Sequence, residues 1–153
     1  MTIIVDANIV FSGILNTNGK IGDILINSEK MFSFIAPDFL RFEIYQHFDK
    51  LMAISKMSLG QVREAEYQIC KSIAFISEEQ IDSSCWLYAE KLVADIDPKD
   101  IVYIAYAKQF QGTLWTGDKK LIKGLSHKNY HDIFTTDNIF DIRNNLLKKR
   151  DMS

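Results

Sequence analysis

Aspartates follow two apolar runs that lie near opposite ends of the sequence. Asp6 comes directly after "TIIV", Asp118 comes two residues after "TLWT", and a "DPKD" segment supplies Asp97 and Asp100. Carboxylates that converge raise one another's pKa unless a cation lies between them, and Mg²⁺ and Mn²⁺ favour oxygen ligands. A cation held in this way can activate water for attack on a phosphodiester. The residue types therefore predict metal-assisted hydrolysis, provided that the fold brings them together.

A further acid, Glu43, lies in the early turns of a helix that we expect to begin at Asp38. Two neighbouring acids could be mistaken for it. Asp38 is expected to cap the helix, and Asp49 lies nearly two turns beyond Glu43, too far from the predicted site. We therefore take Glu43 as the acid that this segment contributes, with a solvated helix face as its alternative role.

Apolar runs alternate with helical patterns along the whole chain. Strands are expected at residues 2–5, 31–37, 73–77, 113–116 and 131–136. Helices are expected at residues 19–30, 38–52, 58–73, 83–93, 97–110 and 137–150, with further helices after Asp6 and Gly117. This alternation favours a parallel sheet with both faces covered, in which helix starts share the carboxyl edge where ligands bind. We therefore expect one α/β domain over residues 1–153, with the acids along that edge.

Helix capping is the alternative explanation for the acids. Asp6 and Asp118 each precede a helix, and an aspartate in that position usually accepts a hydrogen bond from the first turn. Asp97 and Asp100 resemble a capping arrangement at the start of one helix, where the helix dipole favours negative charge. Capping explains each acid singly, but it does not explain why five acids from four segments converge on one predicted edge.

Short polar side chains and lysines accompany these acids in the sequence. Three could donate hydrogen bonds to a ligand carboxylate or to a metal-bound water: Asn8, Ser12 and Thr116. Three lysines close behind Asp118 could line the path of a phosphate backbone: Lys119, Lys120 and Lys123. A local turn or cap is the alternative role for the first group, and a solvated helix face is the alternative for the second.

The composition is that of an ordinary globular domain. Eighteen Lys and Arg against 20 Asp and Glu give a net charge of −2, so attraction to a polyanion must come from a local basic patch or from bound cations. No run approaches the ~18 apolar residues of a membrane span, and the first residues lack a signal-peptide pattern. We expect a cytoplasmic protein without membrane contact, in which Cys70 and Cys85 are free thiols.

Four segments, in this order, resemble the motifs of PIN-domain ribonucleases: "IIVDANIVFSGIL", "APDFLRFEIYQHFDKL", "DPKDIVYIAYAKQFQG" and "TLWTGDKKLI". The resemblance covers residues 2 to about 125. It implies a PIN-like three-layer α/β/α sandwich around a central, mainly parallel sheet of about five strands. It also implies that Asp97 is an auxiliary acid beside a catalytic, metal-binding quartet formed by Asp6, Glu43, Asp100 and Asp118.

The resemblance implies that the protein cleaves single-stranded or structured RNA with Mg²⁺ or Mn²⁺. Many small single-domain members are toxins of toxin–antitoxin pairs, of the VapC type, and are usually homodimers inhibited by an antitoxin. The resemblance therefore implies RNA, an antitoxin protein and a second copy of the chain as partners. The sequence hardly separates such a toxin from an RNA-processing or DNA-acting nuclease.

Two other functions compete with this one. A haloacid-dehalogenase-like phosphatase also opens with an apolar strand and an aspartate, but it needs a second aspartate two residues later, where this chain has Asn8. A PIN-like module that binds nucleic acid or protein without cutting would be indicated by the loss of an acid from the quartet. No acid of the quartet is lost, so the sequence favours the nuclease.

Overall fold

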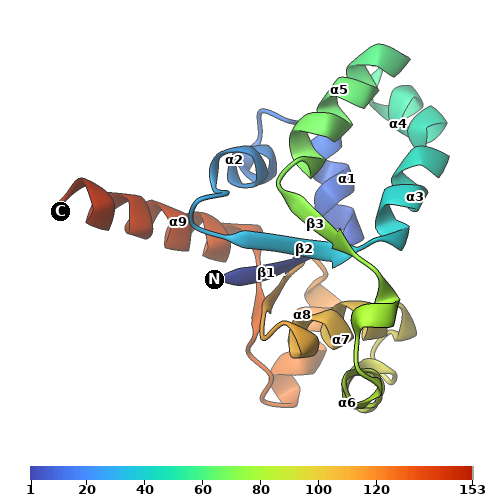
Figure 1. Cartoon of the computed structure of the whole chain (residues 1–153), viewed down its shortest axis with the longest axis vertical. Coiled ribbons are helices and arrows are strands. Elements are labelled where there is room, and N and C mark those ends of the chain that lie inside the picture. The colour runs from blue at the N-terminus through green and yellow to red at the C-terminus, as the bar shows by residue number, and fades with distance from the viewer. Residues whose placement is uncertain (153) are drawn as a thin grey trace.

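The computed structural model describes residues 1–152 and has a five-stranded parallel sheet at its centre (Figure 1). Its strands are β1 (Thr2–Val5), β2 (Ser33–Pro37), β3 (Ile73–Ile76), β4 (Thr113–Trp115) and β5 (Ile133–Phe134). They lie in the order β3-β2-β1-β4-β5, and every neighbouring pair is parallel. The predicted parallel α/β fold is confirmed, although β5 covers only the centre of the run expected at residues 131–136.

Helices cover both faces of the sheet, as Figure 1 shows. On one face lie α1 (Ala7–Leu15), α2 (Lys20–Asn27), α3 (Phe39–Gln46), α4 (Phe48–Ser55) and α5 (Leu59–Cys70). On the other lie α6 (Ser83–Val93), α7 (Ile101–Gln109) and α8 (Lys119–His127), where the 3₁₀ turns η1 (Glu78–Gln80) and η2 (Pro98–Asp100) precede α6 and α7. The last helix, α9 (Thr136–Asp151), lies beside α2. None of the helices in residues 1–152 combines the length and the apolar character needed to span a bilayer.

The central strand β1 is buried on both faces. Ile3 and Val5 point into the core under α1 to α5, whereas Ile4 points into the core under α6 to α8. A strand covered on both faces needs an apolar side chain at every inner position, which "TIIV" supplies. Asp6 is the first charged side chain after this run, and it directly follows the carboxyl end of the strand.

The helix expected over residues 38–52 is wrong in one respect, because it is broken at His47 into α3 and α4. The buried side chains of the two pieces keep the spacing of one helix face: Leu40, Ile44, Phe48 and Leu51. That spacing is the same in a straight and in a bent helix, so the pattern could not locate the break. Asp38 also differs from its predicted role, since its side chain accepts no capping hydrogen bond.

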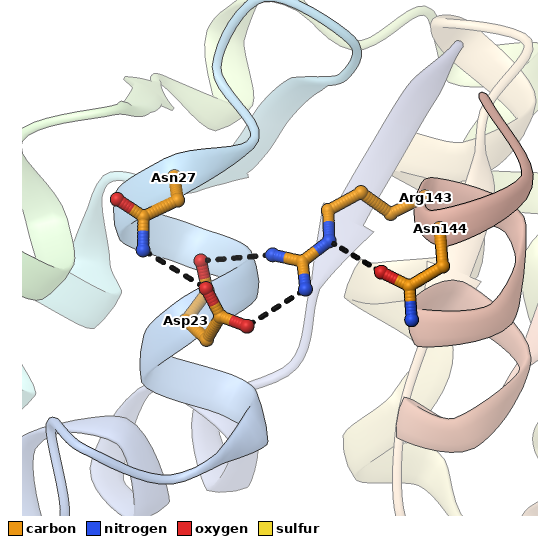
Figure 2. A network of polar contacts seen from close by, with 4 residues as sticks. All are labelled: Asp23, Asn27, Arg143 and Asn144. Carbon is orange, nitrogen blue, oxygen red and sulfur yellow. Dashed lines mark hydrogen bonds and ion pairs between the residues drawn. The ribbon is translucent and has the colours of Figure 1, made fainter. Parts of the chain in front are cut away.

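The last helix is joined to α2 by a buried arginine (Figure 2). Arg143 on α9 is 6% exposed, and its Nη2 donates to Asp23 Oδ2 at 2.7 Å. Asn27 donates to the other oxygen of the same carboxylate at 2.9 Å. The hydrogen bond from Arg143 is the main reason that the pKa of Asp23 lies below its usual value. The position of α9 thus depends on a buried cation that needs the Asp23 carboxylate as its partner.

Removing that carboxylate should leave the guanidinium buried without its anion. We expect Asp23→Ala to lower the free energy of unfolding at neutral pH by about 1–3 kcal/mol, measured by urea denaturation. Because the pKa of Asp23 is lowered in the folded protein, its contribution is complete above the usual aspartate pKa of 3.8 and is lost as the pH falls through the lowered pKa. The difference between wild type and variant should therefore shrink in acid.

The control for this prediction is Asp137→Ala. Like Asp23, Asp137 is an acid in the first turn of its helix, but its ion pair, with Lys20, is exposed, so its replacement should cost less than about 1 kcal/mol. Equal losses in the two variants, or a loss in Asp23→Ala that persists unchanged in acid, would contradict the role given to the buried pair.

Candidate metal centre

The acids singled out by the sequence line one cleft at the carboxyl edge of the sheet. They come from four places in the chain, after β1, on α3, at η2 and after β4: Asp6, Glu43, Asp97, Asp100 and Asp118. The cleft has a volume of about 600 Å³, and its other lining residues are Ala7, Asn8, Phe39, Lys99 and Tyr103. The parallel sheet thus brings together carboxylates that lie far apart in sequence.

Three of these acids do cap helical turns. Asp6 Oδ1 accepts from the Asn8 backbone N–H at 2.8 Å, and Asp97 Oδ1 accepts from the Lys99 N–H at 3.0 Å. Asp118 Oδ1 accepts from the first turn of α8 at 3.0 and 3.1 Å. Each cap uses one oxygen of the carboxylate and leaves the other for a different partner. Capping and metal binding are therefore compatible at these three positions.

Asp100 is different, because its side chain caps nothing. It stands between η2 and α7, is 8% exposed, and makes no capping hydrogen bond. Its Oδ2 is buried and has no hydrogen-bond partner among the described residues. One oxygen from each of Asp97, Asp100 and Asp118 lies within 4.8 Å of the others. A buried carboxylate oxygen without a donor, beside two other carboxylates, is the arrangement that a cation would satisfy.

The electrostatics of the cleft reflect this crowding. Burial, followed by the charges of Asp6, Asp97 and Asp118, raises the pKa of Asp100 to about 7. Burial also raises the pKa of Asp6, although a hydrogen bond from Thr116 opposes the shift. Without a cation, the protein therefore keeps part of this negative charge neutralised by protons near neutral pH.

Thr116 links the acids that follow the two central strands. Its buried hydroxyl donates to Asp6 Oδ2 at 2.6 Å, and its oxygen accepts from the backbone N–H of Asp118 at 3.1 Å. Asn8 is exposed at the rim of the cleft. Ser12 is exposed on α1 and is not among the cleft's lining residues, so the structure does not bring it to the acids.

Comparison with known proteins identifies the family of the chain. A family model described as "PIN domain" matches residues 4–140. The chain belongs to the PIN domain family. The resemblance drawn from the four sequence segments is therefore confirmed.

One solved structure with a similar fold is the crystal structure of VapBC2 from Rickettsia felis bound to a DNA fragment from their promoter. The match has a TM-score of 0.57 and 15% sequence identity, and it covers 88% of this PIN domain and 97% of that chain. At this identity the likeness concerns the fold alone. No curated protein matches the sequence.

The lysines predicted to contact substrate do not line the cleft of this PIN domain. Lys119, Lys120 and Lys123 are all exposed on α8, outside the residues that form its wall. Lys99 lines the cleft instead, and its side chain forms no ion pair among the described residues. The sequence did contain this signal, because Lys99 lies between the two aspartates of "DPKD".

Two aromatic residues of the cleft wall were also missed. Phe39 lies four residues before Glu43 on α3, and Tyr103 lies three residues after Asp100, so each shares a helix face with an acid. Helical spacing from the acids was the signal that could have placed these two at the site.

The residues present fit a hard divalent cation. Every candidate ligand is a carboxylate oxygen, which suits Mg²⁺ or Mn²⁺, and no thiol or imidazole lines the cleft. The sequence assigned the ligands as Asp6, Glu43, Asp100 and Asp118, with Asp97 as an auxiliary acid. The structure places Asp97 in the tight group with Asp100 and Asp118, and it places Asp6 and Glu43 elsewhere on the same cleft wall.

A cation in this group should change the stability of the protein. We expect Mn²⁺ to raise the melting temperature of the wild type but not that of Asp100→Asn, measured by thermal denaturation. In EDTA, where no metal is bound, Asp100→Asn should be more stable than the wild type. Since the pKa of Asp100 is raised to about 7, ionisation opposes folding, and the metal-free wild type should lose about 1–3 kcal/mol relative to the variant as the pH rises from 3.8 through 7.

Asp141→Asn is the matched control for this experiment. Asp141 is exposed on α9 and does not line the cleft, so its replacement should leave both responses at the wild-type level. Equal stabilisation of wild type and Asp100→Asn by Mn²⁺ would contradict a metal site at Asp100.

Proposed function

We propose that this PIN domain is a ribonuclease that cleaves single-stranded RNA with Mg²⁺ or Mn²⁺. The observation that carries the proposal is the buried, unpartnered oxygen of Asp100 within the carboxylate group of Asp97, Asp100 and Asp118. Membership of the PIN domain family supports a nuclease function for that group. A structural role alone gives no reason to bury an unpaired carboxylate beside two others.

The residues of the cleft would have two roles, binding the cation and orienting its ligands. Asp97, Asp100 and Asp118 would hold the cation, and Asp6, which follows β1, and Glu43 on α3 would complete the set. When bound, the cation supplies a water of lowered pKa and offsets charge on the scissile phosphate. Thr116 would keep the Asp6 carboxylate in a fixed orientation through its short hydrogen bond.

The substrate must approach a cleft that is acidic overall. The net charge of −2 provides no general attraction to RNA, so the bound cation and Lys99 would attract the phosphate. Lys119, Lys120 and Lys123 could contact the strand further along, since α8 begins directly after Asp118. Asn8 at the rim could hydrogen-bond a ligand water or the substrate.

The biological setting that we propose is a cytoplasmic toxin–antitoxin pair. Membership of the PIN domain family and the fold likeness to the VapBC2 structure support an antitoxin protein as the partner, and we propose that the chain forms a homodimer. A simple test is expression of the chain alone in bacteria. Wild type should arrest growth and Asp6→Asn should not, whereas equal growth of both would favour an RNA-processing role.

Cleavage of a labelled single-stranded RNA tests the proposed activity directly. Wild type should cleave with Mn²⁺ or Mg²⁺ and should stop on addition of EDTA. Asp6→Asn should reduce the rate by more than about 100-fold, because the site loses a negative charge that faces the cation. Thr116→Val should reduce it by about 10- to 100-fold, because the ligand is kept but its orientation is not.

Asp141→Asn should cleave at the wild-type rate. The outcome that would overturn the proposal is absence of cleavage on several RNAs together with absence of Mn²⁺ binding by calorimetry. In that case Asp6, Asp97 and Asp118 would serve as helix caps alone, and the chain would be a PIN-like binding module.

Lys99 is expected to bind the phosphate rather than to support the fold. Lys99→Ala should raise KM about tenfold and weaken its dependence on salt, because one charge-assisted contact with the strand is removed. Lys119→Ala, Lys120→Ala and Lys123→Ala test the α8 lysines in the same assay. Lys30→Ala removes an exposed lysine next to the amino end of β2 and should have no effect. An unchanged KM in Lys99→Ala would refute this role.

A further inference from the structure

A second hollow opens beside the acidic cleft, on the outer face of α3. It has a volume of about 400 Å³ and is lined by Asp38, Phe39, Phe42, Glu43 and Gln46. Phe39 and Glu43 line this hollow and the acidic cleft alike. The two hollows therefore share a wall, and anything that extends from the cleft over Glu43 reaches Phe42.

Phe42 is exposed to an extent that core packing does not explain. Phe42 is 72% exposed, and among the large apolar residues of the described range 1–152 only Met152 is more exposed. It lies three residues after Phe39 on the same helix face and directly before Glu43. An apolar ring left in water at the rim of a candidate active site indicates a surface that is covered when a ligand binds.

We propose that Phe39 and Phe42 form a platform on which one unpaired base of the RNA strand stacks. This inference rests on the proposed function, since it takes RNA as the substrate and adds a subsite to it. Aromatic side chains bind bases through their flat faces, whatever the base, and a base is free to stack in this way when its strand is single. The Gln46 amide and the Asp38 carboxylate line the same hollow, where they can hydrogen-bond the polar edge of the base.

The charges around the platform favour a base over a protein surface. A protein that covered Phe42 would also bury the carboxylates of Asp38 and Glu43, which is unfavourable unless each gains a cationic partner. A stacked base is small, and it can give the Asp38 carboxylate a hydrogen-bond donor while Glu43 still lines the acidic cleft. The other exposed aromatic residue of α3, Tyr45, lines a separate hollow with residues of α5, so it does not join Phe42 in one apolar face.

Cleavage of RNAs that each lack one base would locate the platform. On wild type, loss of one base near the cut should raise KM about 5- to 100-fold while kcat changes less. Phe42→Ala should raise KM on intact RNA by a similar factor. In this variant, loss of that base should raise KM no further, because the substitution and the base loss remove the same contact. Phe42→Trp should restore the response. Tyr45→Ala, which removes a 53% exposed aromatic from the same helix, should behave as wild type.

Equilibrium binding tests the platform without cleavage. The probe is single-stranded RNA with 2-aminopurine placed at each position in turn, in Ca²⁺, whose looser coordination is expected to hold the strand without cutting it. Stacking should quench the fluorescence at one position in wild type, Phe42→Trp and Tyr45→Ala, and Phe42→Ala should remove that quenching.

The outcomes separate this inference from the proposed function. Suppose that the protein cleaves RNA, and that Phe42→Ala changes neither the dependence of KM on the missing base nor the position at which 2-aminopurine is quenched. This result would overturn the platform and keep the nuclease. Quenching that depends on Phe42, in a protein that cleaves no RNA, would keep the platform and overturn the nuclease. A dimer that Phe42→Ala dissociates, with both profiles unchanged, would show that a second copy covers this face, and it would overturn the platform.

Discussion

The pairing of β1 with β4 is the interaction on which the rest of the site depends. The parallel ladder continues one step beyond the strands, where the Asp6 N–H donates to the Trp115 carbonyl at 3.2 Å. That bond sets the register that places Thr116 within 2.6 Å of the Asp6 carboxylate and leads the chain to Asp118. A slip of one residue would turn Asp6 and Thr116 to opposite faces. Apolar packing on both sides of β1 thus fixes the distance between two acids that contribute nothing to the core.

Helix starts make the convergence of these carboxylates tolerable in the free protein. Asp6 and Asp118 each face the amino end of a helix and accept backbone N–H groups, which offsets part of their mutual repulsion. Asp100 receives no such bond, and its pKa is raised by its burial and, to a lesser extent, by the charges of Asp6, Asp97 and Asp118. Capping and metal binding therefore describe two uses of the same carboxylates rather than rival explanations. The acid that no cap stabilises is the one for which a cation matters most.

The sequence predicted those features that depend on a continuous apolar run or on the residue that ends it. "TIIV" and "TLWT" predicted the strands because a buried parallel strand needs continuous apolar residues, and the acids after them located the edge of the sheet. Features that depend on how elements meet in space were not predicted. The break at His47 leaves the apolar spacing of α3 and α4 unchanged, and the outward position of the α8 lysines depends on the rotation of α8 about its axis. Lys99 lies between the two aspartates of "DPKD", but its place in the cleft wall depends on the 3₁₀ turn that carries it.

Carboxylates around a cation act on the phosphate, which every nucleotide carries, so they cannot by themselves choose a substrate. Under the proposed function, selection must come from whatever the strand touches on its way into the cleft, and α3 is well placed for this because Glu43 and Phe39 share one of its faces. Leu40 and Ile44 hold the inner face of α3 against the core, and Phe42 lies on the exposed face of the same helix. A base can stack on α3 only after it has unstacked from its neighbours in the strand, and the bases of a duplex stay paired and stacked. The preference for single strands would then follow from the shape of α3 rather than from the acids.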